Sequence, residues 1–364
     1  MGLMAQTTIY TNDMDYVIGD VKQAFIQDKI STGTQVDNLL AGFKAMKVNG
    51  IRIPIFPTGL EPNEQALNYF IQRATEEGFP IFANPAQGSG GQRIACESLA
   101  EEDRVAVKDD AEKRQILIDR IILIDKTYPD IKWINPFNED AKTGTVWSVS
   151  DINTIYSTLA NSNLNAELIG SCVWGIPAGI DILKNTDITD YITVSTTHNL
   201  GFNHSSWTEF ISLSRAAGLP VWDSEVNHNK KYENKATRLE AALSYGVDGL
   251  VLYDSWSNIS LTTGEVSSGG QTLMSLYLKP TSLDVIKDQT SNFDVYSHPS
   301  ALSIDLFNAS ASHNIKLVNI SGTQVWSASN VTSSEVYIDN LQKGVYILLV
   351  ESNGITQSTK AVVL

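Results

Sequence analysis

Short apolar segments alternate with longer amphipathic segments from the start of the chain to about residue 290. The apolar segments carry too few polar residues for one side to face water, which is typical of parallel strands covered on both faces. About eight strand–helix units, of roughly 30 residues each, fit this part of the chain. We expect strands at Thr7–Tyr10, Gly50–Ile55, Pro80–Asn84, Ile131–Glu139, Glu167–Val173, Tyr191–Ser195, Leu219–Glu225 and Gly249–Asp254. The pattern predicts a (β/α)₈ TIM barrel over residues 7–288.

Amphipathic segments between these strands are expected to form the covering helices. They are Val36–Val48, Pro62–Glu77, Asp109–Lys126, Asp151–Leu159, Trp207–Ala217 and Ala236–Tyr245, with a long polar, Gly-rich loop before Val107. An open doubly wound sheet is the alternative fold, and it would normally show a Gly-rich phosphate-binding turn after its first strand. No such turn is present there, so the closed barrel is favoured.

The pattern changes from about Asn292, where helical periodicity stops and short alternating strands begin. The expected strands are Leu302–Leu306, Ile315–Val318, Val336–Ile338, Val345–Val350 and Lys360–Val363. They predict a small all-β sandwich over residues 293–364, joined to the barrel through the polar segment Asp288–Asn292.

Composition excludes several classes of function. The net charge of −15 argues against nucleic acid or an anionic membrane as a partner, because both favour basic surfaces. No apolar segment approaches the roughly 20 residues that a membrane-spanning helix needs. The two cysteines, Cys96 and Cys172, can form at most one disulfide and no cysteine-based zinc site.

Two of the expected strands end in a glutamate, at Glu139 and Glu225. Parallel strands bring their carboxyl ends to one face of a barrel, so these two carboxylates are expected to lie close together. Glycoside hydrolysis uses such a pair, one as proton donor and the other as nucleophile or as the base that activates water. The alternative is that both glutamates simply end their strands in water.

The other strand ends make the pattern specific. Strand two carries Arg52, Asn138 precedes Glu139, His198 follows strand six and Trp256 follows strand eight. This arrangement resembles the large clan of retaining glycoside hydrolases with (β/α)₈ barrels. The resemblance implies that Glu139 is the acid/base and Glu225 the nucleophile.

The same resemblance assigns the surrounding residues. It implies that Asn138 binds the sugar 2-hydroxyl, that Arg52 keeps Glu225 ionised and that Trp256 forms the floor of the central subsite. Many members carry an aromatic residue two positions beyond the strand-six histidine, where this chain has Leu200. The contact to the nucleophile is therefore open between His198 and Tyr253.

Four tryptophans, Trp147, Trp174, Trp207 and Trp256, follow strand ends on the expected catalytic face, whereas Trp133 and Trp222 lie within strands and are expected in the core. Indole rings match the C–H faces of pyranose rings, although each could equally pack beneath its own loop. Four on one face predict a cleft with several subsites and an endo-acting enzyme.

Other chemistries have little support in the sequence. His198, His204 and His228 are not spaced as paired ligands on one element, so no metal site is predicted. No Gly-X-Ser-X-Gly elbow is present for serine catalysis, and we expect no cofactor.

The tail resembles the C-terminal sorting domain that Bacteroidetes attach to exported proteins. The matching segments are Ile315–Gly322, Leu341–Tyr346 and the final strand at Lys360; family members usually carry Asn-Pro near the start, where this chain has His298-Pro299. A carbohydrate-binding module is the alternative, but only Trp326 is a tryptophan in this region. The resemblance implies a partner in a secretion machinery, and we read Met1–Gln6 as an expression start joined to the stub of a removed signal peptide.

Together these observations predict a secreted or cell-surface, monomeric endo-glycosidase that hydrolyses a β-linked plant or algal polysaccharide. A non-catalytic, surface polysaccharide-binding barrel is the alternative. Few cations are expected near the barrel mouth: Arg93, Lys142, Lys230 and Lys231. A heavily sulfated polymer would need more of them, so a neutral or sparsely sulfated substrate is favoured.

Overall fold

The chain divides into two compact units, Met1–Lys279 and Pro280–Leu364, and each is described by itself. The structure is a computed structural model that describes residues 14–228, 237–278, 293–298, 300–307, 312–319, 322–352 and 355–363.

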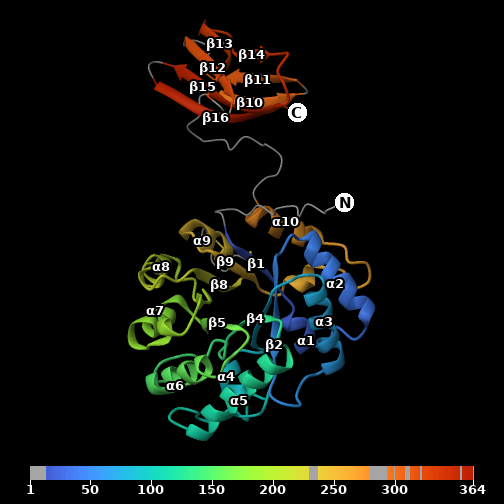
Figure 1. Cartoon of the computed structure of the whole chain (residues 1–364), viewed down its shortest axis with the longest axis vertical. Helices are drawn as coiled ribbons and strands as arrows, with labels where there is room; N and C mark the ends of the chain where they lie inside the picture. Colours follow the sequence, from blue (N-terminus) through green and yellow to red (C-terminus); the bar gives the residue numbers. More distant parts are fainter. Residues whose placement is uncertain are drawn as a thin grey trace. The chain divides into compact units, whose positions relative to one another are not determined.

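The first unit is a closed parallel barrel (Figure 1). Its strands are β1 (Tyr16–Asp20), β2 (Gly50–Ile55), β3 (Ile81–Pro85), β4 (Ile131–Ile134), β5 (Glu167–Leu168), β6 (Gly170–Val173), β7 (Ser195–Thr197), β8 (Val221–Val226) and β9 (Gly249–Leu252). They run in the order β5-β4-β3-β2-β1-β9-β8-β7-β6.

The segments β5 and β6 are two halves of one barrel strand, separated only by Ile169. The N–H of Ile169 donates to Ile134 O of β4 at 3.1 Å, and the N–H of Gly170 donates to Val194 O at 3.1 Å, just before β7. One strand position therefore bonds to both neighbours, which closes the sheet at eight positions, as the sequence predicts.

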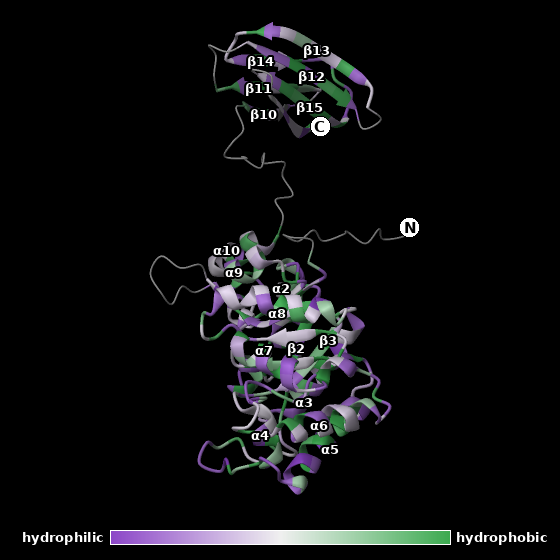
Figure 2. Cartoon of the chain, turned by 90° about the vertical axis from the view of Figure 1, so that its left-hand side faces the viewer, coloured by the Kyte–Doolittle hydropathy of each residue, from purple (hydrophilic) through white to green (hydrophobic). Residues whose placement is uncertain are grey.

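Helices surround the barrel in Figure 1, and Figure 2 shows polar and apolar residues interleaved along them. They are α1 (Lys22–Ile26), α2 (Gly33–Ala45), α3 (Glu64–Glu76), α4 (Gly90–Ala95), α5 (Ala111–Thr127), α6 (Val149–Ala160), α7 (Ile176–Asn185), α8 (Trp207–Ala216), α9 (Arg238–Tyr245) and α10 (Ser268–Tyr277). None of the described helices has the length and apolar character to cross a membrane.

Packing inside the barrel holds opposite strands together. Trp133 of β4 and Trp222 of β8 are nearly inaccessible, and their rings meet edge to face at 4.9 Å between centroids. Both were expected in the core, and this is confirmed. A larger apolar cluster lies between the strands and the covering helices.

Several sequence-based boundaries need correction. Thr7–Tyr10 lies outside the described residues, and the first barrel strand is β1 at Tyr16–Asp20. β4 ends at Ile134, so Glu139 stands on the loop that follows rather than on the strand itself. The expected loop before Val107 contains α4, while α7 and α10 were not anticipated.

The second unit is all-β. One sheet has the order β10-β11-β14, built from β10 (Phe293–His298), β11 (Ala301–Leu306) and β14 (Glu335–Ile338). The other has the order β13-β12-β15-β16, built from β13 (Gln324–Val331), β12 (His313–Asn319), β15 (Gly344–Ser352) and β16 (Ile355–Val363). Side chains of both sheets share one apolar cluster, so they form the predicted sandwich, with β10 and β13 as additional strands.

Deleting the chain from residue 280 onward should leave the barrel folded and active on soluble substrate. The reason is that the apolar clusters of the barrel draw only on residues before 280, and that of the sandwich only on residues after 292. Thermal unfolding and turnover of the truncated protein measure this outcome. An insoluble barrel, or one that loses most of its activity on short oligosaccharides, would show that the tail is part of the catalytic unit.

Candidate active site

Glu139 and Glu225 meet at the carboxyl ends of the barrel strands. A carboxylate oxygen of each and a ring nitrogen of His198 all lie within 4.8 Å of one another. Glu225 is the fifth residue of β8, and Glu139 is fixed by its own backbone, whose N–H donates to Cys172 O at 2.8 Å. The two glutamates predicted from separate strand ends are therefore brought together.

Arg52 lies between Asp20 and Glu225 and forms an ion pair with each. Its guanidinium donates to both carboxylate oxygens of Asp20, at 2.9 and 2.8 Å, and to Glu225 Oε2 at 3.2 and 3.3 Å. Burial alone would raise the pKa of Asp20, but Arg52 beside it lowers that pKa overall. One buried cation thus lies between two carboxylates and fixes the orientation of Glu225.

Both the oxygen and the nitrogen of the Asn138 side-chain amide form hydrogen bonds. Lys22 Nζ donates to Asn138 Oδ1 at 3.0 Å and to Asn84 Oδ1 at 2.6 Å, while Asn138 Nδ2 donates to Gln87 O at 2.9 Å. Burial lowers the pKa of Lys22 to about 7, and the neighbouring Arg52 adds to this. Asn138 is thereby fixed next to Glu139 by partners that the sequence did not reveal.

His198 is fully buried behind the two glutamates. Its Nδ1 lies 3.8 Å from Glu139 Oε1, too far for a hydrogen bond, and among the described residues neither ring nitrogen has a hydrogen-bond partner. Burial lowers the pKa of His198, but the charge of Glu225 and the contacts with Cys172 and Glu139 raise it to about 9. Burial raises the pKa of Glu139, yet the His198 cation, followed by Lys22 and Arg52, brings that pKa below its usual range.

Replacing His198 by glutamine should move the alkaline limb of the pH–activity profile to higher pH. Without the imidazolium, the pKa of Glu139 rises, so the proton donor stays protonated to higher pH. The measurement is kcat/KM against pH, with His204→Gln as the matched control that should leave the limb in place. An unshifted limb in a folded His198→Gln protein would contradict the assignment of Glu139 as proton donor.

The four loop tryptophans divide into two pairs. Trp147 and Trp207 are completely buried, so the prediction that they contact substrate is wrong: Trp147 packs in the core and donates through Nε1 to Asp140 Oδ2 at 3.1 Å. Trp174 is 43% exposed, and Trp256 is partly buried with its indole N–H bonded to Asp254. Only Trp174 and Trp256 keep ring surface available to a ligand.

The sequence analysis missed four buried ionisable residues around the glutamates, Asp20, Lys22, Asp140 and Asp223. Asp20 is the last residue of β1 and Lys22 lies two residues beyond it, and the sequence analysis placed this strand at Thr7–Tyr10 instead. Asp140 accepts from the backbone N–H of Gln92 at 2.7 Å and of Asn138 at 3.0 Å, which ties the Glu139 loop to α4. Burial raises the pKa of Asp223 to about 7. The sequence could have identified the three acidic residues, because each lies in an apolar strand or within six positions of one.

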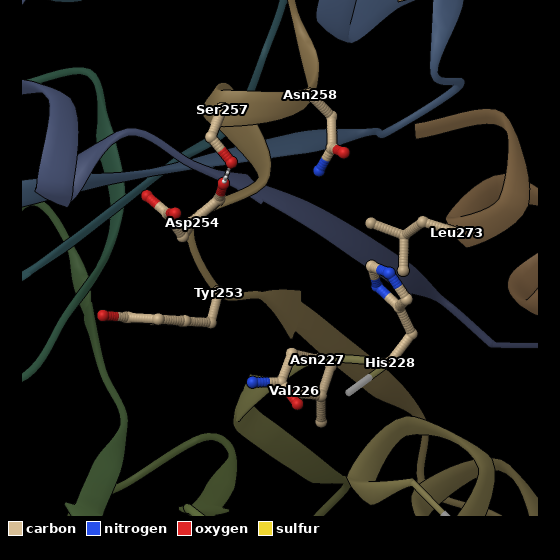
Figure 3. A pocket seen from close by; sticks show the side chains of 8 residues that line it. All are labelled: Val226, Asn227, His228, Tyr253, Asp254, Ser257, Asn258 and Leu273. Atoms are coloured by element: carbon tan, nitrogen blue, oxygen red, sulfur yellow. Dashed lines mark hydrogen bonds between the residues drawn. The ribbon is translucent and has the colours of Figure 1, made fainter. Parts of the chain in front are cut away.

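Beside the β8 end of the site lies a cavity of about 160 Å³, shown in Figure 3. Figure 3 shows Tyr253 extending away from His228, and burial, followed by the charge of Glu225, raises the pKa of Tyr253 to about 12. The lining is mostly polar: Val226, Asn227, His228, Tyr253, Asp254, Ser257, Asn258 and Leu273.

The two glutamates also belong to a group that could hold a cation. Within the described part of the chain, Glu139, His198 and Glu225 form the one group of three potential metal ligands close enough to share an ion. A metal ion there would occupy both carboxylates.

The tail matches a known family. Residues 295–364 match the family model of the secretion system C-terminal sorting domain, which indicates secretion and cell-surface attachment. No curated protein sequence matches the chain.

Solved structures of glycoside hydrolases share the fold. An endo-β-1,4-mannanase double mutant from Cellulomonas fimi aligns over 97% of this chain and 95% of its own, at 10% identity and a TM-score of 0.50. A GH30 endoxylanase from Clostridium papyrosolvens C71 aligns over 90% and 94%, at 13% identity and a TM-score of 0.48. An FMN-binding β-glucuronidase from Facaelibacterium prausnitzii L2-6 aligns over 98% of this chain at 9% identity and a TM-score of 0.45, and this chain spans 59% of its length. At 10% identity, the likeness to the mannanase concerns the fold alone.

Proposed function

We propose that this protein is a secreted, retaining endo-glycosidase that hydrolyses a β-linked polysaccharide. The observation that carries the proposal is the approach of the Glu139 and Glu225 carboxylates to within 4.8 Å between oxygens. Retaining enzymes place their two carboxyl groups about 5 to 5.5 Å apart, whereas inverting enzymes need about 6.5 to 9.5 Å to admit a water.

In the first step Glu225 attacks the anomeric carbon while Glu139 gives its proton to the glycosidic oxygen. The C–O bond to the leaving sugar breaks, and an ester forms between the remaining sugar and Glu225. Arg52 holds Glu225 Oε2 at 3.2 Å, which favours the ionised carboxylate that this attack requires.

In the second step Glu139, now ionised, removes a proton from water, and the water oxygen attacks the same anomeric carbon. The ester bond breaks, Glu225 is released as a carboxylate, and Glu139 regains its proton. The cations that lower the pKa of Glu139 favour the ionised form used in this step.

Charge near the mouth supports a neutral or sparsely sulfated substrate. Arg93 donates to Gly88 O and Leu99 O, and Lys142 Nζ lies over the Trp174 ring, 5.6 Å from its centroid. Lys230 and Lys231 lie outside the described residues. Arg93 and Lys142 thus both contact other groups of the protein. They are therefore poorly placed to form the ion pairs that would replace the hydration of sulfate groups.

Trp174 and Trp256 support a polymeric substrate, because exposed indole surface beside a catalytic pair suits pyranose rings in neighbouring subsites. The test is a panel of β-glucans, mannans, xylans and agar-type galactans assayed for reducing-end release. Proton NMR of the first product should show the β-anomer before mutarotation. The α-anomer as first product, or no release from any polymer, would refute the proposal.

A further inference from the structure

The outer face of the three-stranded tail sheet carries a row of aromatic side chains. Tyr296 of β10 pairs with Ser303 of β11, and Ser303 pairs with Tyr337 of β14. Residues that pair directly across antiparallel strands project from the same face. Tyr296 is 46% exposed and Tyr337 60% exposed, whereas Ser303 between them is only 8% exposed. The row therefore places an exposed aromatic ring on each side of the buried Ser303.

His298 lies on the same face, next to Ser303 and Tyr337. Its Nε2 lies 2.9 Å from Ser303 Oγ, and its ring centroid lies 5.9 Å from that of Tyr337. Phe293, Val295, Leu302 and Ile304, which alternate with these residues, are buried in the sandwich core. The aromatic rings are thus outside the core that holds the domain together.

A second row beside the first is entirely acidic. Asp294 pairs with Asp305, and Asp305 pairs with Glu335. Like charges directly opposite one another oppose sheet formation, so this row costs stability. Asp294 is buried and already accepts from the Tyr296 hydroxyl at 3.4 Å, and sugar hydroxyls that donate to Asp305 and Glu335 would offset more of the repulsion.

Charge excludes anionic partners from this face. None of β10, β11 and β14 carries a lysine or arginine; the three lysines after residue 292 are Lys316 on β12, Lys343 before β15 and Lys360 on β16. A phosphorylated lipid surface or a sulfated polymer would meet carboxylates without a compensating cation.

We propose that this aromatic–acidic face binds a neutral, β-linked polysaccharide. The two tyrosines are separated by two strand spacings, roughly 9.5 Å. That spacing is close to the length of one disaccharide unit in an extended β-linked chain, so alternate sugar rings meet the tyrosines while their hydroxyls donate to Asp305 and Glu335. The inference deepens the proposed function, because the tail then contacts the polymer that the barrel cuts.

The test uses the full chain carrying Glu225→Gln, so that hydrolysis does not consume the ligand. Its retardation is measured in native gels that contain β-glucan, mannan or xylan, and compared with the same protein carrying Tyr296→Ala and Tyr337→Ala. We expect affinity for at least one polymer to fall roughly tenfold in the double alanine variant. Tyr296→Phe with Tyr337→Phe should retain binding, because the rings remain, and Val325→Ala, an exposed residue of the other sheet, should have no effect.

Several outcomes overturn the proposal: no retardation of the parent in any gel, or equal retardation of the parent and the double alanine variant. Normal retardation combined with failed export of the double alanine variant from a host with the secretion system would assign the face to that machinery instead. Tyrosine-dependent retardation in a protein that hydrolyses none of the polymers would support the face and refute the glycosidase. With the parent glutamate restored, activity of the double alanine variant on short oligosaccharides should be unchanged.

Discussion

Replacing Glu225 by glutamine is expected to reduce hydrolysis by at least roughly 10³-fold while leaving polysaccharide binding largely intact. Glutamine has nearly the same shape as glutamate but cannot form the covalent ester with the anomeric carbon. The measurement is reducing-end release on the best polymer, together with binding of the same polymer. Glu209→Gln, a surface change on α8, is the matched control.

Unchanged turnover in Glu225→Gln would remove Glu225 from the mechanism. A parent protein that binds the polymer without cutting it would instead favour the alternative of a non-catalytic polysaccharide-binding barrel. The binding assay separates these cases, because it does not depend on turnover.

Replacing Glu139 by alanine should reduce turnover on the polymer by roughly 10²- to 10⁴-fold, the usual contribution of general acid–base catalysis. With an aryl glycoside that has an acidic leaving group, the rate of the first step should fall less, because departure of that group needs no proton donor. Azide should restore turnover, because it attacks the glycosyl ester without a base. The product is expected to be the β-glycosyl azide.

The same experiment on Glu225→Ala provides the control for stereochemistry. Azide can there occupy the space of the lost nucleophile and attack the substrate directly, which gives the α-glycosyl azide. Identical azide products from Glu139→Ala and Glu225→Ala would contradict the two distinct roles.

The barrel was predictable because most of its strands are apolar runs bounded by polar segments, and burial on both faces of a parallel sheet demands such runs. Strand β7 is an exception, since it is Ser-Thr-Thr and shares only Ser195 with the predicted strand Tyr191–Ser195. Strand β1 was misplaced because Thr7–Tyr10 has stronger β-propensity than Tyr16–Asp20, which ends in Gly19 and Asp20. Because of this error, the sequence analysis missed two residues of the site. Asp20 and Lys22, which orient Arg52 and Asn138, come directly from that strand end.

The approach of Glu139 and Glu225 was predictable for a different reason. The ends of parallel strands converge on one face of a barrel whatever the loops do, so strand-end glutamates meet even when the boundary of β4 is wrong by several residues. The tryptophans follow no such rule. Trp147 and Trp207 begin or precede helices, and whether an indole there turns inward depends on packing that spacing does not encode.

The backbone of Glu139 has a φ of 72°, in the left-handed region that glycine and asparagine tolerate best. A side chain such as glutamate costs roughly 1–2 kcal/mol in that region. The bond to Cys172 O holds the residue there. Under the proposed mechanism, replacing Glu139 by glycine would relieve strain at the same time as it removes the proton donor. At this position the backbone strain and the proposed catalytic role therefore belong to the same residue.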